Sequence, residues 1–174
     1  QISLQFGEQP LSSSNYGKII NEKHFNRISG LIDKNKVVFG GQTDSETLQI
    51  SPTVMDHVTY EDKVMQEEIF GPVACLLPFK DEAEGLRLAN DVEYGLASYI
   101  WTQDVSKVLR LARGIEAGMV FVNTQNVRDL RQPFGGVKAS GTGREGGEYS
   151  FEVFAEMKNV CISMGDHPIP KWGV

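Results

Sequence analysis

The chain has 174 residues, of which 40% are hydrophobic and 23% charged, and its formal net charge is −6. These values predict one globular domain with a substantial core. The acidic balance argues against nucleic acid as a partner, because no basic field is present to displace counterions. No apolar run is long enough to cross a membrane, and we find no secretory signal or clustered cysteine and histidine. We therefore expect a cytoplasmic protein without a metal site.

The first part of the chain predicts one clear helix between irregular segments. Residues 1–10 resemble the end of a helix. In residues 21–34, apolar side chains recur at the three-four spacing of an amphipathic helix. Residues 37–41 predict a short strand that ends in a glycine turn, and residues 48–58 predict an extended segment. Pro52 keeps that segment irregular or at a sheet edge.

The middle part alternates between apolar strands and helices. The strands are expected at 71–79, 96–102 and 118–124, and the helices at 81–92 and 104–115. Asp81 and Asp104 stand where N-caps are preferred. The inner face of the first helix is expected from Ala83, Leu86, Leu88 and Ala89. Strands that are apolar on both faces predict an α/β fold, with helices on both faces of a parallel sheet.

A glycine-rich loop follows at residues 125–147, and it contains a tempting motif. Gly141 to Gly146 read GTGREG, the G-x-G-x-x-G pattern of a dinucleotide-binding turn, and Asp166 lies at the distance expected for a ribose contact. That motif requires a buried strand directly before its first glycine, whereas the preceding residues read RQPFGGVKAS. We therefore interpret the stretch as a tight structural loop, with a small dinucleotide-binding domain as the lesser alternative.

The last part predicts a short helix around residues 148–156 and a strand at 159–165. The two cysteines do not look like nucleophiles. Cys75 lies in an apolar strand, where burial raises the pKa of a thiol and blocks access to it. Cys161, in the late strand, is no better placed.

Two stretches carry a family resemblance. Residues 66–73, QEEIFGPV, and residues 133–147, PFGGVKASGTGREGG, are together similar to signatures of the aldehyde dehydrogenase superfamily. From residue 71 to the end the chain looks like the semialdehyde dehydrogenases of that family. Residues 1–64 look more like its class 3 and fatty-aldehyde branch. This difference suggests a composite chain with a seam near residues 65–71, a hypothesis that mass spectrometry of the source gene product would test.

The resemblance implies a domain organisation and a reaction. Residues 1–150 would be the C-terminal part of a catalytic domain, and residues 151–174 an oligomerisation strand and tail of a homodimer or homotetramer. The family's dinucleotide domain and nucleophilic cysteine would lie upstream. The reaction would oxidise a small aldehyde, such as a dicarboxylic semialdehyde, with NAD; the sequence leaves NADP open. Alone, the chain would be inactive. The competing interpretation is a truncated or engineered α/β module without catalysis.

The resemblance also implies cofactor contacts. Glu68 matches the carboxylate that binds the nicotinamide ribose hydroxyls, and carboxylate oxygens suit this role because they only accept hydrogen bonds. Phe70 matches the residue that packs beside the ribose and nicotinamide. From the residues alone, the alternative is a helix end with solvated Glu67 and Glu68, and with Phe70 in the core. Glu67 is taken as structural.

Three further residues match substrate positions. Phe134 matches an aromatic residue that lines the substrate tunnel, with a core phenylalanine as the alternative. Arg128 and Arg131 lie in the loop that matches the family's substrate-anchoring loop, and each could form a bidentate pair with a substrate carboxylate. The alternative is a pair of surface arginines that flank Asp129.

Overall fold

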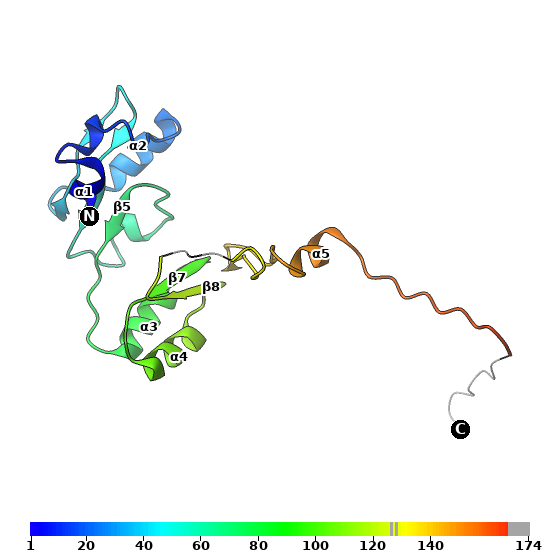
Figure 1. The fold of residues 1–174 in the computed structure, drawn as a ribbon. Coiled ribbons are helices and arrows are strands. Elements are labelled where there is room, and N and C mark those ends of the chain that lie inside the picture. Colours follow the sequence, from blue (N-terminus) through cyan, green and yellow to red (C-terminus); the bar gives the residue numbers. More distant parts are fainter. Residues whose placement is uncertain (126, 128, 167–174) are drawn as a thin grey trace. The chain divides into compact units, whose positions relative to one another are not determined.

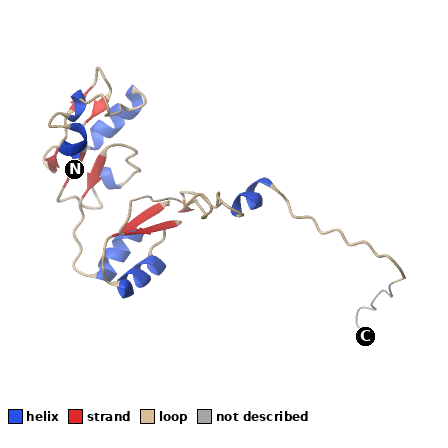
Figure 2. Cartoon of the chain, in the orientation of Figure 1, coloured by secondary structure: helices blue, strands red, loops and turns tan. Residues whose placement is uncertain are grey.

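The computed structural model describes residues 1–125, 127 and 129–166 (Figure 1). The chain divides into two compact units, Gln1–Phe79 and Lys80–Val174. Helices and short strands occur in both units (Figure 2).

The first unit contains a small mixed sheet. Its elements are α1 (Ile2–Phe6), η1 (Pro10–Ser12), α2 (Glu22–Leu31), β1 (Val37–Phe39), β2 (Thr43–Asp44), β3 (Gln49–Ile50), β4 (Thr53–Met55), η2 (Lys63–Met65) and β5 (Val73–Cys75). The sheet has the order β1-β4-β5, with β1 antiparallel and β5 parallel to β4. Strands β2 and β3 form a separate antiparallel hairpin. Pro52 stands between β3 and β4, as expected for a residue that cannot donate to a ladder.

Helix α2 confirms the predicted amphipathic helix. Asn21 caps it, because its Oδ1 accepts a hydrogen bond of 3.0 Å from the backbone N–H of His24. Phe25, Ile28 and Leu31 are buried on one face. They pack in one core cluster with apolar side chains of the strands and loops, namely Ile50, Met55, Val58, Val64 and Val73.

The predicted glycine turn after β1 is also confirmed. Gly40 has φ +76°, and a methyl group built on it would lie 2.0 Å from the carbonyl oxygen of Pro52. Only glycine allows this approach of the turn to the start of β4.

The second unit contains the regular strand–helix alternation. Its elements are α3 (Glu82–Asn90), β6 (Tyr94–Gly95), β7 (Ala97–Ile100), α4 (Val105–Gly114), β8 (Met119–Val122), β9 (Val137–Lys138) and α5 (Tyr149–Phe154). Strands β7 and β8 are parallel, from Ala97 opposite Met119 to Ile100 opposite Val122, whereas β6 and β9 are antiparallel.

Both predicted caps of this unit are confirmed. Asp81 Oδ1 accepts from the backbone N–H of Glu84 at 2.8 Å, and Asp104 Oδ1 accepts from that of Lys107 at 3.0 Å. The expected inner face of α3 is only half right. Leu86 and Leu88 are half-buried, whereas Ala83 and Ala89 are exposed.

Leu86 marks the contact between α3 and α4. A methyl group built on Gly114, the last residue of α4, would lie 2.5 Å from Leu86 Cδ2. On the surface, Arg110 of α4 forms a bidentate ion pair with Glu82 of α3, at 2.8 and 2.9 Å. The two helices therefore lie side by side.

The α/β class is confirmed, whereas one parallel sheet with helices on both faces is not. In the described residues the strands form a three-stranded sheet and three two-stranded ladders, and parallel pairing is limited to β4–β5 and β7–β8. Apolar strands that alternate with helices indicate parallel pairing, but the pattern does not say which strands are neighbours. Here the strand at Val73–Cys75 pairs with β4, which the sequence marked only as an irregular extended segment.

The strand predicted at residues 159–165 has no ladder in this single chain. Residues 155–166 are exposed and form no helix or strand. Because an edge strand is defined by its pairing, this segment would need a neighbour to become one. In the described part of the chain, no helix combines the length and apolar character that crossing a membrane requires.

Candidate functional site

The segment that carries Glu68 and Phe70 is tied to helix α2 by one arginine. Arg27 Nη1 donates to Glu67 Oε2 at 3.0 Å and to the carbonyl oxygen of Glu68 at 3.1 Å. Its Nη2 donates to the carbonyl oxygen of Ile69 at 2.6 Å. The planar guanidinium can reach several acceptors at once because its donors are fixed in a fork. One side chain therefore binds three consecutive residues of the loop.

The next residue of α2 fixes the other side of Phe70. Ile28 is fully buried, and a methyl group built on Gly71 would lie 2.8 Å from its Cδ1. Beyond Gly71, the carbonyl oxygen of Pro72 accepts a hydrogen bond of 2.9 Å from the backbone N–H of Thr53. The loop is thus packed against the helix core before it enters β5.

Phe70 lies between these two attachments in an unusual conformation. Its φ is +48°, in the left-handed region that a bulky residue rarely adopts, and the residue is 82% exposed. The alternative that placed Phe70 in the core is therefore wrong. Glu68 is also exposed, whereas the neighbouring Glu67 faces Arg27. Such strain persists only where the surroundings hold it, and it is enriched at functional sites.

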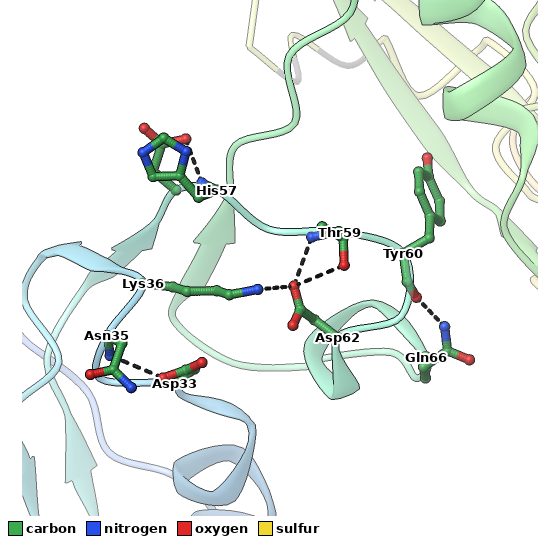
Figure 3. Close-up of polar contacts among 9 residues, drawn as sticks. Asp33, Asn35, Lys36, His57, Thr59, Tyr60, Asp62 and Gln66 are labelled. Atoms are coloured by element: carbon green, nitrogen blue, oxygen red, sulfur yellow. Dashed lines mark hydrogen bonds and ion pairs between the residues drawn. The ribbon is translucent and has the colours of Figure 1, made fainter.

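A second cation holds the chain just before this loop (Figure 3). Lys36 Nζ lies 2.5 Å from Asp62 Oδ2, which also accepts from the backbone N–H of Thr59 at 2.7 Å. Hydrogen bonds from Lys36 and from the Thr59 backbone hold the pKa of Asp62 below its usual value. The Gln66 side chain donates to the Tyr60 carbonyl. Both ends of the turn that leads to Glu68 are therefore anchored.

Phe134 lies in the second unit beside hollow surfaces. It is half-buried, and its backbone exchanges two hydrogen bonds with Glu145, at 2.7 and 2.8 Å. It lines a cavity of about 330 Å³ together with residues of β8 and of the following loop, including Asp129 and Gln132. It also borders a second hollow of about 310 Å³. This placement suits a lining residue better than an enclosed core residue.

Arg131 is engaged by its own chain. Its Nε and Nη2 contact Asp129 Oδ1 and Oδ2 at 2.9 and 2.6 Å, and its backbone N–H donates to Oδ1 at 2.9 Å. These side-chain and backbone hydrogen bonds lower the pKa of Asp129. The bidentate geometry expected for a substrate carboxylate therefore exists with Asp129, at the edge of the Phe134 cavity. Arg128 lies outside the described residues.

The glycine motif is built as a tight loop. Gly146 has φ +94°, and a methyl group on it would lie 2.5 Å from the carbonyl oxygen of Gln132. Its N–H donates to Ser150 Oγ at 2.9 Å. Strand β9, which precedes Gly141, has only two residues and pairs antiparallel with β6. The close backbone packing predicted for this loop is confirmed.

The environment of Cys75 agrees with the sequence argument. This side chain is half-buried against the core cluster. Burial first, and then the negative charge of Asp62, raise the pKa of its thiol. Cys161 is exposed, in the segment that follows α5.

The structure groups the candidate residues by unit. Glu68 and Phe70 share one loop of the first unit, and Phe134 and Asp129, the partner of Arg131, line one cavity of the second. Sequence reasoning missed Arg27 as the residue that holds the loop, because its partners lie some forty positions away along the chain. The only local signal was a cation beside the buried Ile28 of an amphipathic helix.

Helices beside small sheets place both units in the α/β class. The chain matches the profile of the Aldehyde dehydrogenase family over residues 2–160. It therefore belongs to the aldehyde dehydrogenase family, as its motifs predicted.

Individual members of this family show how similar the chain is to known proteins. The chain is 58% identical over 160 residues to the 5-carboxymethyl-2-hydroxymuconate semialdehyde dehydrogenase of Escherichia coli. This match covers 84% of this chain and 34% of that protein. It is 39% identical over 173 residues to the 2-hydroxymuconic semialdehyde dehydrogenase of Pseudomonas putida, with 93% and 36% covered. The NAD⁺ complex of an aldehyde dehydrogenase from Bacillus cereus superposes with a TM-score of 0.80 at 34% identity, over 88% of this chain and 32% of that one. The chain thus spans about a third of the length of the curated relatives it matches. The seam near residues 65–71 stays a prediction.

Proposed function

We propose that this chain is part of an NAD(P)-dependent dehydrogenase that oxidises an aldehyde to the carboxylic acid, and that it supplies cofactor and substrate contacts. The observation that carries the proposal is the clamped loop, which turns Glu68 and the strained Phe70 toward solvent while Arg27 and Ile28 hold its backbone. Family membership supports the reaction class. The name of the Bacillus cereus complex supports NAD, with NADP left open.

The chemistry of Glu68 and Phe70 fits the nicotinamide ribose. In the described part of the chain, the exposed Glu68 carboxylate forms no hydrogen bond or ion pair, so both oxygens remain available as acceptors for two ribose hydroxyls. The exposed Phe70 ring offers an apolar face beside it. When bound, NAD(P)⁺ supplies the acceptor for a hydride. These residues bind and orient the cofactor, which brings the reacting groups into a favourable geometry.

We place the substrate at the cavity lined by Phe134. The names of the two curated relatives support a semialdehyde with an acidic group. Arg131, and Arg128 outside the described residues, are proposed to bind its carboxylate by bidentate hydrogen bonds. Aldehyde oxidation through covalent catalysis needs an accessible thiolate. Because the Cys75 thiol is half-buried with a raised pKa, and Cys161 lies beyond α5, we assign no nucleophile to this sequence.

The organisation of the chain follows from the same proposal. Residues 1–150 belong to the catalytic domain, and residues 151–174 are proposed to form the oligomerisation strand and tail of a cytoplasmic homo-oligomer. The exposed apolar side chains after α5 support this division.

Replacing Glu68 by Gln in the full-length protein tests the cofactor assignment. We expect the KM for NAD⁺ to rise about tenfold with a smaller change in kcat, because a charged acceptor of two hydroxyls becomes a neutral one. Glu46→Gln makes the same chemical change on an exposed turn of the same unit and should leave the KM unchanged. Steady-state kinetics with an acidic semialdehyde give both values. An unchanged KM in Glu68→Gln would contradict the assignment.

A further inference from the structure

Arg27 has an unusual set of partners for a helix-surface arginine. Two of its three acceptors are backbone carbonyl oxygens, those of Glu68 and Ile69, and only the third is a carboxylate, that of Glu67. Its side chain is only 26% exposed. A surface ion pair alone would not need this burial or these carbonyl bonds, so the arrangement points to control of the loop backbone.

The contacts lie on both sides of the strained residue. The Ile69 carbonyl, directly before Phe70, is bound by Arg27, and Gly71, directly after it, packs on Ile28. Arg27 and Ile28 are neighbours in α2, and the buried Ile28 anchors that turn of the helix in the core. The left-handed backbone at Phe70 is therefore held between two attachments to one rigid helix.

We infer that Arg27 is a positioning residue that sets the conformation of the cofactor loop through the carbonyls of Glu68 and Ile69. Its fork holds the backbone so that the Glu68 carboxylate and the Phe70 ring are turned outward and ready for the ligand. The hydrogen bonds of Arg27 to the loop are sufficient support for its positioning role. Its consequence for cofactor affinity rests on the proposed function.

Arginine suits this positioning role better than lysine or glutamine. Lysine keeps the positive charge and the aliphatic stem but carries a single nitrogen, so it cannot hold two carbonyls and a carboxylate in one plane. Glutamine lacks the charge as well. The loop of residues 67–70 should therefore be less ordered in Arg27→Lys than in the parent protein, and least ordered in Arg27→Gln.

Cleavage by a glutamate-specific protease measures loop order directly. We expect cutting after Glu68 to require release of the loop from helix α2, whereas Glu46, on an exposed turn of the same unit, serves as the internal reference site. In the full-length protein, we expect Arg27→Gln to raise the rate at Glu68 relative to Glu46 about tenfold. Arg27→Lys should lie between this variant and the parent. Mass spectrometry of the fragments gives the two cleavage rates. An unchanged ratio of these rates in both variants would overturn the inference.

Two matched variants separate the carbonyl bonds from the ion pairs. Glu67→Gln weakens the carboxylate contact of Arg27 and keeps both carbonyl bonds, so the Glu68 to Glu46 ratio should change less than about twofold. Arg110→Gln removes a bidentate arginine–glutamate pair between α3 and α4, and it should leave the ratio unchanged. If Glu67→Gln loosened the loop as much as Arg27→Gln, the ion pair would be the cause and the inference would fail.

Kinetics test the consequence for the cofactor. The KM for NAD⁺ should rise in Arg27→Gln more than kcat falls, and Arg27→Lys should restore part of it. Gly71→Ala displaces the same loop from Ile28 without touching Arg27, so the two changes should be less than additive. Full additivity would contradict action through the loop.

The two proposals can fail separately. If Arg27→Gln frees the loop but Glu68→Gln leaves NAD⁺ binding unchanged, the positioning role stands and the cofactor assignment falls. If Glu68→Gln weakens NAD⁺ binding while Arg27→Gln changes neither cleavage nor KM, the cofactor assignment stands and the positioning role falls.

Discussion

The Asp129 carboxylate forms a bidentate pair with the guanidinium of Arg131, the geometry proposed for a substrate carboxylate. Both side chains lie at the surface, with that of Arg131 88% exposed, so solvent screens the pair and it contributes little to stability. A carboxylate ligand could therefore replace Asp129 at small cost. If Arg131 binds an acidic substrate as proposed, Asp129 would neutralise the arginine in the unliganded protein.

Substitutions at these two residues should have opposite effects on an acidic substrate. In the full-length enzyme, Arg131→Leu is expected to lower kcat/KM for an acidic semialdehyde about tenfold, because a charged bidentate contact is lost. Asp129→Asn should raise it, since the competing carboxylate is gone. A neutral aldehyde of similar length is the control substrate and should respond to neither change. Arg128→Leu is measured in parallel. If both arginine variants kept full activity on the acidic substrate, the carboxylate role would be ruled out.

Residue-scale roles were only partly visible in the sequence. Motif matching singled out Glu68 and Phe70 as expected cofactor contacts, and the structure shows both residues exposed on one loop. It did not identify Arg27, whose proposed positioning role depends on bonds to carbonyl groups that carry no side-chain signature. A hydrogen bond to the backbone of a residue far away in the chain produces no recognisable sequence pattern.

At the scale of elements, the glycine loop shows how a correct motif can mislead. The letters of Gly141 to Gly146 fit a dinucleotide turn, yet the conformation depends on what packs against each glycine. Gly146 approaches the Gln132 backbone, whereas the nearest atom to a methyl group on Gly143 would be a Val153 side-chain carbon at 3.8 Å. The two glycines of one motif therefore have different structural requirements.

Alanine at these two glycines should separate the requirements. Gly146→Ala is expected to lower the free energy of unfolding by about 2 kcal/mol or more, because it adds left-handed strain and a clash with a carbonyl oxygen. Gly143→Ala should change it by less than about 1 kcal/mol. Chemical denaturation of the full-length variants measures both. Equal effects would mean that the close approach at Gly146 does not determine the loop.

At the scale of the whole molecule, the segment after α5 combines an extended backbone with exposed apolar side chains. Its apolar side chains are exposed in the single chain, including Met157, Val160, Ile162 and Met164. Exposed apolar chain of this kind is typical of an interaction surface, and an unpaired extended segment can add to a sheet edge.

One charge in this segment should disrupt assembly of the full-length protein. We expect Ile162→Asp to shift the mass seen in sedimentation equilibrium from a homo-oligomer toward a smaller species, because a carboxylate would be buried at the contact. Lys158→Gln, in the same segment, removes a charge without touching an apolar side chain and should leave the mass unchanged. A parent protein that sediments as a monomer would refute the proposed role.

The sequence by itself determined the local elements and the family. Helices α2, α3 and α4 and the caps at Asp81 and Asp104 were predicted, because periodicity and capping act over a few neighbouring residues. The family motifs were readable for the same reason, since each is a short contiguous stretch. Only the tertiary structure decided that β5 pairs with β4, that Phe70 stands exposed in a left-handed conformation, and that Arg27 holds it there. Those outcomes depend on contacts between distant residues, and they arise only when the chain brings those residues together.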